Sequence, residues 1–325
     1  MTVLDNLGRD SVRVVFLMDP LSQVEFSKDT TYQLMLACDE LGYQTYYMAA
    51  GQITLDQGVP FCSCYHVRAL SDPASFEVGD KTVLSGADID VLFVRTEPPF
   101  SDRYLTDTWL LDLFPESCRV VNRPSGIRSV NEKVWVTQFT DLVPSTLVTA
   151  DMHRIRAFIQ IYNSVIIKPL NGFGGKGIFK VSLDDPNLGA ILETVTKLGQ
   201  QEVIVQDFIS QASEGDKRIL LQDGEILGAV LRHNSGPEHR NNLMAGGQAS
   251  PVDITDRDRE ICKVIQPHLK ALGLYFVGID VIGSYLIEVN VTSPTCLQEL
   301  NRFSSYRYDI QIMKDLVLSS SALSA

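Results

Sequence analysis

Residues 164–181 read SVIIKPLNGFGGKGIFKV, and this stretch decides the fold of the chain. Apolar runs on both sides of a glycine cluster predict two strands joined by a hairpin loop. The glycines fit the spacing G-x-G-x-x-G, but a dinucleotide site needs a helix after that motif, and here a strand follows. A P-loop is excluded as well, because Gly177 stands where that motif requires Ser or Thr.

The glycine loop instead resembles a flap whose bare backbone N–H groups can cover nucleotide phosphates, with a flexible hairpin turn as the alternative. Lys168 favours the flap, because lysine is rarely buried unpaired and this one stands in an apolar strand. A phosphate is an obvious partner for its ammonium group. Lys133 stands near the start of a predicted helix, where a cation is unfavourable, and a bound anion would explain it. A solvated surface lysine is the simpler alternative.

Downstream of this loop, further strands are predicted in hairpins. DKRILLQ (216–222) and EILGAVLR (225–232) flank an Asp-Gly turn, and YFVGIDVI (275–282) and YLIEVN (285–290) flank Gly283. Helices are expected just before the loop, at 151–162, and after it, at 186–198 and 255–272. This part of the chain therefore predicts α+β architecture, with mostly antiparallel sheets.

Upstream, the pattern predicts a parallel α/β layer. Strands are expected at 12–18, 43–49, 90–95 and 119–122, with one helix capped by Asp29 and another at 104–114. Ser129 and Glu132 fit an S-x-x-E capping box, which predicts a helix across NEKVWVTQF (131–139). The predicted domains are 1–122, 123–203 and 204–318, followed by a disordered tail at 319–325.

Polar residues interrupt the last hairpin. Asp280, Glu288 and Asn290 are set into apolar strands, where burial of unpaired carboxylates is costly. Oxygen ligands of this kind suit Mg²⁺ bridging to phosphates, and an ion pair between Glu288 and Arg218 or another basic residue is the alternative. A plain two-residue turn at 283–284 would put Asp280 and Glu288 on opposite faces, so a shared metal site requires a bulge or an odd-numbered turn.

Two further segments suggest ligand contacts. IVQDFI (204–209) ends a buried strand and suits a hinge where an adenine lies between apolar walls. Residues 230–250 show little periodicity and predict a lid, in which Arg232, Arg240 and Asn242 would hold a carboxylate substrate. A disordered surface loop is the alternative for this second segment.

Composition limits the possible functions. The chain has 325 residues, with 45% hydrophobic and 21% charged, which predicts a globular protein with more than one core. Its net charge of -12 argues against nucleic-acid or membrane-surface binding. Six scattered cysteines and no long apolar run favour a cytoplasmic location. Cys62, Cys64 and His66 could meet a metal, but no fourth ligand follows, so we favour a plain strand.

Eight stretches in combination resemble one family. They are MDPL (18–21), KDTTY (28–32), VRTEPPF (94–100), NEK (131–133), IIKPLNGFGGKGIF (166–179), GDKRIL (215–220), AGGQ (245–248) and VGIDVIGSYLIEVNVTSPT (277–295). The chain is similar over nearly its whole length to the prokaryotic glutathione synthetases of the ATP-grasp superfamily. This resemblance implies an ATP-grasp fold with an N-terminal α/β domain. It also implies ATP-dependent ligation of γ-glutamylcysteine to glycine through an acyl phosphate, with release of ADP and phosphate.

The resemblance also implies roles for individual residues. Nucleotide binding falls to Lys133, Lys168, Gly172, Gly174, Gly175, Gly177, Gln206, Phe208, Ile209 and Asp216. Arg218 and Lys168 would be the catalytic residues. Asp280, Glu288 and Asn290 would bind Mg²⁺ or Mn²⁺. Arg218, Arg232, Arg240, Asn242 and Ser293 would bind the peptide and glycine.

The chain departs from the family pattern at three places: Asn171 replaces a usual Asp, Asn241 a lid glycine and Thr96 a common Lys. Two other functions stay open, namely an ATP-grasp ligase for another amino-acid or peptide pair and a non-catalytic ATP-binding regulator. We expect small-molecule partners and a homo-oligomer, with a tetramer as one option.

Overall fold

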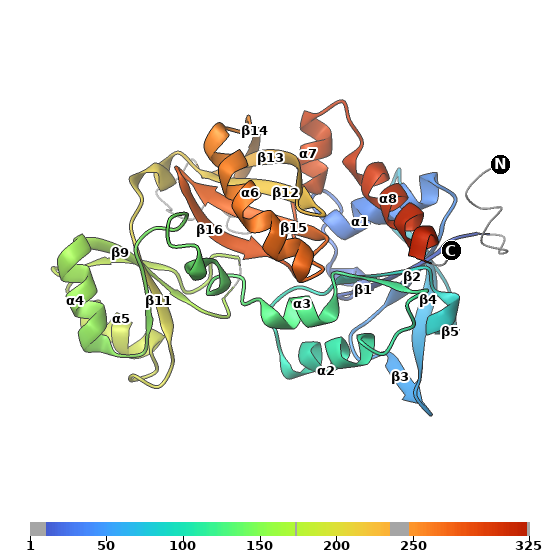
Figure 1. Cartoon of the computed structure of the whole chain (residues 1–325), viewed down its shortest axis with the longest axis horizontal. Helices are drawn as coiled ribbons and strands as arrows, with labels where there is room; N and C mark the ends of the chain where they lie inside the picture. Colours follow the sequence, from blue (N-terminus) through green and yellow to red (C-terminus); the bar gives the residue numbers. More distant parts are fainter. Residues whose placement is uncertain (1–10, 173, 235–246, 324–325) are drawn as a thin grey trace.

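The apolar run near the start of the chain forms β1 (Arg13–Met18), the central strand of the first lobe. As predicted, β1 pairs in parallel with β2 (Gln44–Met48) and β6 (Val91–Arg95), and β6 pairs in parallel with β7 (Arg119–Val121). The computed structural model describes residues 11–172, 174–234 and 247–323, and within these the chain forms three lobes in a row (Figure 1).

Antiparallel strands extend this sheet, and of these only the one that contains Cys62 and Cys64 was predicted, as a plain strand. They are β3 (Ile53–Asp56), β4 (Val59–Ser71) and β5 (Ala74–Ser85), which give the order β3-β4-β2-β1-β6-β7, with β5 beside β4. Cys62 and Cys64 lie buried on one face of β4, and a bulge between Tyr65 and Val67 leaves His66 exposed. The cysteines and His66 therefore do not converge, which confirms the preference for a plain strand.

Helices cover both faces of the first sheet. They are α1 (Thr30–Glu40), α2 (Asp102–Leu111), α3 (Pro124–Ser129) and α8 (Tyr308–Leu323). The Asp29 side chain caps α1 by accepting from the backbone N–H of Tyr32, as predicted. A disordered tail was predicted from residue 319, but α8 continues to Leu323. Ile312, Met313 and Leu316 of this helix are buried in the core, and a helix that has started extends readily by further residues.

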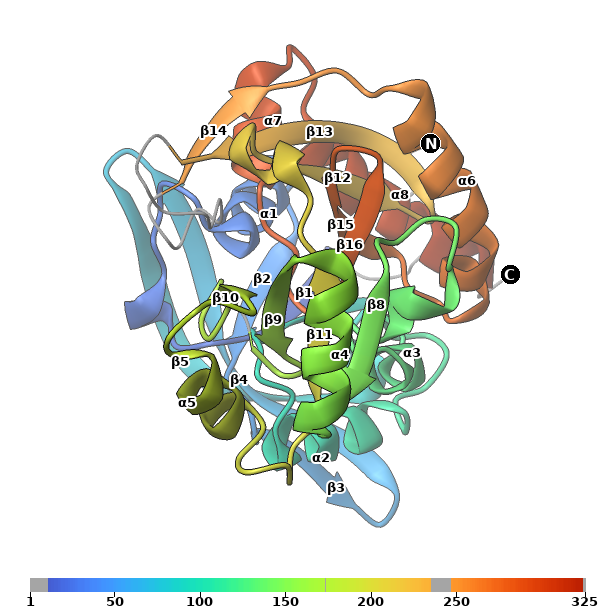
Figure 2. The same ribbon diagram turned by 90° about the vertical axis from the view of Figure 1, so that its left-hand side faces the viewer.

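The central lobe has its own sheet and core. Its strands are β8 (Thr146–Thr149), β9 (Ser164–Pro169), β10 (Phe179–Ser182) and β11 (Val203–Asp207), in the order β10-β9-β11-β8. The helices α4 (Met152–Tyr162) and α5 (Leu188–Val195) pack on it (Figure 2). The sheet extends to the end of β11, so the predicted boundary at 203 falls at the start of a strand of this lobe.

The third lobe contains the second and third hairpins. Its strands are β12 (Asp216–Gln222), β13 (Glu225–His233), β14 (Gln248–Pro251), β15 (Phe276–Ile282) and β16 (Tyr285–Asn290), covered by α6 (Asp256–Ala271) and flanked by α7 (Leu297–Phe303). The sheet order is β14-β13-β12-β15-β16, with antiparallel pairing throughout. The predicted α+β architecture is thus confirmed.

The first and third lobes are joined by continuous apolar packing, because each of two core clusters contains residues from both. Asn122 follows β7 and reaches the third lobe: its amide donates to the carbonyls of Phe276 and Val291 and accepts from the Phe276 N–H. Gly126 is needed here, since a Cβ would lie 2.2 Å from the carbonyl oxygen of Leu272. No helix in the described ranges is long and apolar enough to cross a membrane.

The predicted helix across residues 131–139 is wrong. Asn131 begins a turn there by accepting from the backbone N–H groups of Lys133 and Val134, and only a short 3₁₀ helix, Trp135–Gln138, follows. Ser129 bonds back to the Ser125 carbonyl, and Glu132 is occupied elsewhere. The capping box therefore does not form, because tertiary partners use the Glu132 side chain.

Candidate active site

A cavity lies between the central and third lobes. Its walls come from β9, the glycine loop, the end of β11 and the β15–β16 hairpin. All of the predicted nucleotide-binding residues except Gly177 line it, namely Lys133, Lys168, Gly172, Gly174, Gly175, Gln206, Phe208, Ile209 and Asp216. The structure thus brings together residues that are far apart in the sequence.

Lys168 is the buried cation of this cavity. Its side chain is 5% exposed, and its Nζ donates to Oε1 of Gln206 at 3.1 Å. Gln206 in turn donates to the Thr146 hydroxyl at 2.9 Å, which fixes the amide. Burial lowers the pKa of Lys168 to about 8, partly offset by the charge of Glu288. An amine held in this way is poised to pair with an anionic ligand.

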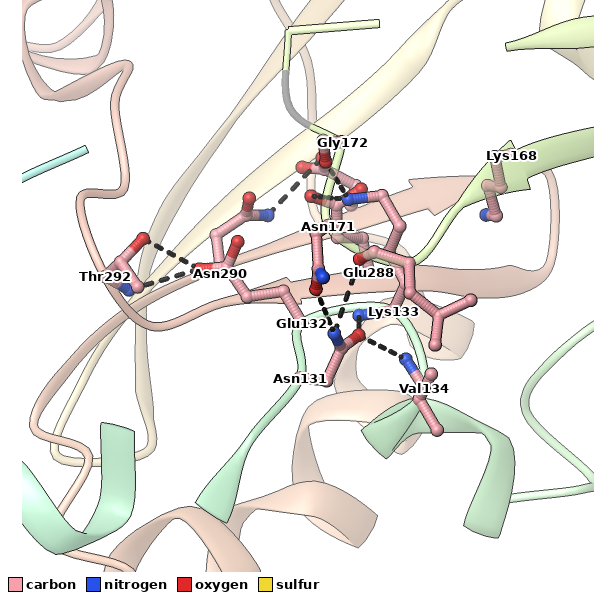
Figure 3. A network of polar contacts seen from close by, with 12 residues as sticks. Asn131, Glu132, Lys133, Val134, Lys168, Asn171, Gly172, Glu288, Asn290 and Thr292 are labelled. Atoms are coloured by element: carbon pink, nitrogen blue, oxygen red, sulfur yellow. Dashed lines mark hydrogen bonds and ion pairs between the residues drawn. The ribbon is translucent and has the colours of Figure 1, made fainter. Parts of the chain in front are cut away.

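Asn131, Glu132 and Lys133 reach in different directions from one turn (Figure 3). The Asn131 amide donates to the Leu170 carbonyl and to Oδ1 of Asn171, both at 3.3 Å, at the base of the glycine loop. Nζ of Lys133 donates to the Gly172 carbonyl at 2.6 Å and lies 3.6 Å from Oε1 of Glu288. This turn therefore joins the glycine loop to the third lobe.

Glu132 is a site residue that sequence reasoning missed. Its Oε1 accepts from the N–H groups of Val291 and Thr292 and from the Thr292 hydroxyl, at 2.8, 3.1 and 3.0 Å (Figure 3). Burial, together with the charge of Glu288, raises the pKa of Glu132. The only sign of this role in the sequence is that an acidic residue directly precedes Lys133. The partners of Glu132 lie about 160 residues further along the chain, so they could not be predicted from local sequence.

Replacing Glu132 with alanine is expected to lower the free energy of unfolding by about 1–3 kcal/mol, because buried donors lose their acceptor. Glu132→Gln should stay close to the native stability, since its amide oxygen still accepts and the repulsion from Glu288 is removed. Urea denaturation of both variants measures the difference. Equal stability of the alanine variant and the native protein would contradict this role.

The β15–β16 hairpin contains the bulge that a shared metal site requires. Residues 283–284 form a two-residue turn, because Ile282 pairs with Tyr285, and the register then shifts so that Asp280 pairs with Glu288. The Asn290 amide nitrogen lies 3.5 Å from Oδ2 of Asp280, on the same face. This confirms the predicted irregularity and the common face of the three residues.

Asp280 is part of a buried row of alternating charges. Its carboxylate accepts from Arg218 at 2.5 and 2.9 Å and lies 2.9 Å from Nη2 of Arg232. Arg232 also donates to both oxygens of Asp216, at 2.8 and 2.6 Å. Burial alone would raise the pKa of Asp280, but the two guanidinium groups hold it well below its usual range. Asp280 therefore stays ionised.

A second cavity adjoins the first at Gly174 and Glu288. Arg218, Arg232, Asn290 and Ser293 line it from the third lobe, and Gln23, Glu25, Lys28, Asp29 and Glu97 from the first lobe. Lys28, Asp29 and Glu97 lie in stretches that carried the family resemblance, but the sequence assigned them no role, and it did not single out Gln23 or Glu25. Arg240 and Asn242, which were predicted to bind substrate, lie outside the described residues.

Solved structures of two synthetases have the same fold as this chain. D-cycloserine synthetase is 14% identical with a TM-score of 0.67, covering 94% of this chain and 99% of that one. D-alanyl-alanine synthetase A from Vibrio cholerae is 11% identical with a TM-score of 0.61, covering 96% and 98%. This chain therefore has the fold of these two synthetases, with a glycine-loop lobe facing an antiparallel sheet.

Sequence comparisons then give the family. Residues 12–128 match the prokaryotic glutathione synthetase N-terminal domain, and residues 132–305 match the prokaryotic glutathione synthetase ATP-grasp domain. Glutathione synthetase from Shewanella oneidensis is 40% identical over 292 residues, covering 89% of this chain and 93% of the relative. That from Thermosynechococcus vestitus is 38% identical over 312 residues, covering 92% and 98%. The chain belongs to the prokaryotic glutathione synthetase family, and it is an ATP-dependent ligase.

Proposed function

We propose that this protein joins γ-glutamylcysteine to glycine and converts ATP to ADP and phosphate. The observation that carries the proposal is the meeting of two cavities at Gly174 and Glu288. One contains the lysines that suit phosphate groups, and the other contains the arginines that suit a carboxylate. A γ-phosphate in the first can therefore face a carboxylate in the second.

In the first step, an oxygen of the cysteinyl carboxylate attacks the γ-phosphorus of ATP, and the bond to the ADP oxygen breaks. Lys133 and Lys168 would hold the phosphate oxygens and neutralise the charge that develops between them. The products of this step are ADP and an acyl phosphate. Burial of Lys168 strengthens its contribution, because little water screens its charge.

In the second step, the glycine amine attacks the carbonyl carbon, phosphate leaves, and the amine loses a proton. Arg218 would stabilise the oxyanion that forms on the carbonyl oxygen, since it lines the second cavity and is fixed by Asp280. An acyl phosphate hydrolyses readily in water, so the glycine loop must cover the site while this step occurs.

The residues present fit a divalent cation. Asp280, Glu288 and Asn290 offer two carboxylates and an amide oxygen on one face, while no group of three or more His, Cys, Asp or Glu side chains converges among the described residues. That set suits Mg²⁺, or Mn²⁺, held by few carboxylates together with phosphates. The ion would neutralise phosphate charge when bound.

Phosphate release tests the proposal. Purified protein is given ATP, Mg²⁺ and γ-glutamylcysteine with each amino acid in turn, and release should depend on the dipeptide and be fastest with glycine. Preference for a different donor or acceptor would indicate another ATP-grasp ligase. ATP binding without release would indicate a regulator.

Alanine at Gly174 or Gly175 is expected to lower turnover more than ATP affinity. Both glycines have positive φ values, +60° and +78°, which L-residues adopt at a cost of about 1–2 kcal/mol. If the loop must close over the phosphates for the reaction, the substitution disfavours the closed state and so lowers turnover more than ATP affinity. Steady-state kinetics and nucleotide titration separate the two effects, and equal losses in both would indicate a static binding turn.

Two further expectations belong to this proposal: a homo-oligomer, which light scattering would test, and a cytoplasmic location, where ATP is available.

A further inference from the structure

Arg95, the last residue of β6, is a buried cation that hydrogen-bonds only neutral groups among the described residues. It is 2% exposed, and its Nε donates to the Thr31 hydroxyl at 3.1 Å while its Nη2 donates to the Pro294 carbonyl at 2.9 Å. Its Nη1 is buried with no hydrogen-bond partner in the described part of the chain. Burying a guanidinium group without a carboxylate costs stability, so a functional reason for it is worth seeking.

The two partners of Arg95 belong to opposite walls of the second cavity. Thr31 lies in the first turn of α1, two residues after Asp29, which lines the cavity from the first lobe. Pro294 lies in the middle of segment 293–295, and the residues on both sides of it line the cavity from the third lobe. Arg95 is not part of the lining. Its guanidinium group therefore joins the two walls from behind the cavity.

Segment 293–295 has few other polar contacts. Within the described residues, the bond from Arg95 to the Pro294 carbonyl is its only hydrogen bond that reaches beyond its own chain neighbour. Thr292 and Leu297, on either side of the segment, have their own bonds to other parts of the chain. The segment is thus fixed at both ends, and Arg95 holds its middle.

We infer that Arg95 is a positioning residue for the donor peptide: tied to the first lobe at Thr31, it sets where segment 293–295 stands at the second cavity. This inference rests on the proposed function, and Arg95 acts through the segment without touching the substrate. The planar guanidinium group suits this role, because its N–H groups donate in two fixed directions at once. The single ammonium group of a lysine, on a flexible stem, cannot fix the two walls in the same way.

Four variants test this inference. Arg95→Met removes both bonds and the charge, whereas Arg95→Lys keeps the charge without the rigid fork. Thr31→Val removes the hydroxyl that ties Arg95 to the first lobe and keeps the shape of the side chain. Arg119→Met is the matched control, because Arg119 begins the neighbouring strand β7, donates to the Leu316 carbonyl at 3.3 Å and is not part of the second cavity lining. Thermal unfolding checks that each variant is folded, and Thr31→Val serves if Arg95→Met does not fold.

Kinetics with γ-glutamylcysteine and titration with ATP give the first readout. KM for γ-glutamylcysteine is expected to rise about tenfold or more in Arg95→Met and by less in Arg95→Lys and Thr31→Val, because a binding state that is populated only part of the time lowers the apparent affinity by that fraction. ATP affinity should stay near the native value in all four variants. A merely structural role would lower the amount of active protein, and so kcat, and would leave KM unchanged. Arg119→Met should keep the native KM.

The double variant Thr31→Val with Arg95→Met tests whether Thr31 acts through Arg95. Its KM for γ-glutamylcysteine should equal that of Arg95→Met alone, because the hydroxyl has nothing left to hold.

Hydrogen exchange reports on the segment without turnover. Peptides that cover 291–297 contain the N–H groups of Val291, Thr292 and Leu297, which donate to side chains outside the segment. These peptides should exchange faster in Arg95→Met and Thr31→Val than in the native protein or in Arg119→Met, because the loop opens more often when its middle is released.

The inference is overturned if folded Arg95→Met keeps the native KM for γ-glutamylcysteine, or if its affinities for γ-glutamylcysteine and ATP fall together. A native KM in Arg95→Lys would assign the effect to charge alone and would overturn positioning by the guanidinium fork. Absence of phosphate release by the native protein with any donor would refute the proposed function instead. Exchange across 291–297 would then decide whether Arg95 fixes the segment, and an unchanged rate in Arg95→Met would overturn that role as well.

Discussion

Replacing Lys168 with methionine is expected to abolish measurable ATP binding while the fold stays intact. The ammonium group is buried in the nucleotide cavity, and Gln206 is its only hydrogen-bond partner that the described residues supply. Removing a buried charge that pairs with phosphate should cost about 2–3 kcal/mol or more, which corresponds to roughly 30-fold to more than 100-fold in affinity. Methionine keeps the unbranched shape, so packing changes little.

Isothermal titration with ATP measures this loss, and circular dichroism and thermal unfolding check the fold. Lys263→Met is a suitable control, because Lys263 is exposed on α6 and is not part of the cavity lining. Tight ATP binding by folded Lys168→Met would refute the nucleotide assignment of this lysine.

The same pair of proteins should show a defined pH dependence of stability. Burial lowers the pKa of Lys168 from 10.5 to about 8 in the folded protein. Between these values the unfolded chain binds more protons than the folded one, so stability of the native protein rises with pH through this window. The methionine variant lacks this term, so its stability advantage should be largest below about pH 8 and shrink toward pH 10.5.

Arg232→Met is expected to have the largest effect on stability. Arg232 is 3% exposed and holds the carboxylates of both Asp216 and Asp280. Without it, Asp216 loses both of its side-chain hydrogen bonds in the described structure, and Asp280 keeps only Arg218. Breaking a buried ion pair by removing one partner costs about 3–5 kcal/mol.

A double-mutant cycle in urea tests this explanation. Asp216→Asn combined with Arg232→Met removes both charges of one pair, so it should recover part of the stability that Arg232→Met alone loses. Additive losses in the double variant would show that the two side chains contribute independently, which the contacts of 2.6 and 2.8 Å argue against.

Much of the fold followed from local pattern. The glycine loop between two apolar strands, the Asp-Gly turn at 223–224 and the Asp29 cap were all readable, because strand alternation, turn chemistry and capping depend on residues close in sequence. The common face of Asp280 and Glu288 could also be stated in advance as a geometric requirement, because side chains alternate along a strand.

Other features depended on contacts between distant segments. Ser129 and Glu132 have the spacing of a capping box, but Val291 and Thr292 compete for the Glu132 carboxylate and prevent it. The end of the chain looked like a polar tail, but packing of α8 in the core continues the helix to Leu323.

By itself, the sequence determined the class of fold, and it predicted which lysines would bind phosphate and which oxygens would bind a metal, since each depends on residue type within a short segment. The tertiary structure alone decided which charges meet. Arg232 was predicted to bind substrate, but its contacts with Asp216 and Asp280 were not predicted. A cavity beside Tyr104, in the first lobe, was not foreseen either. The physical reason is that ion pairs and cavities arise between side chains from segments that are far apart in the sequence, and local periodicity contains no information about those distances.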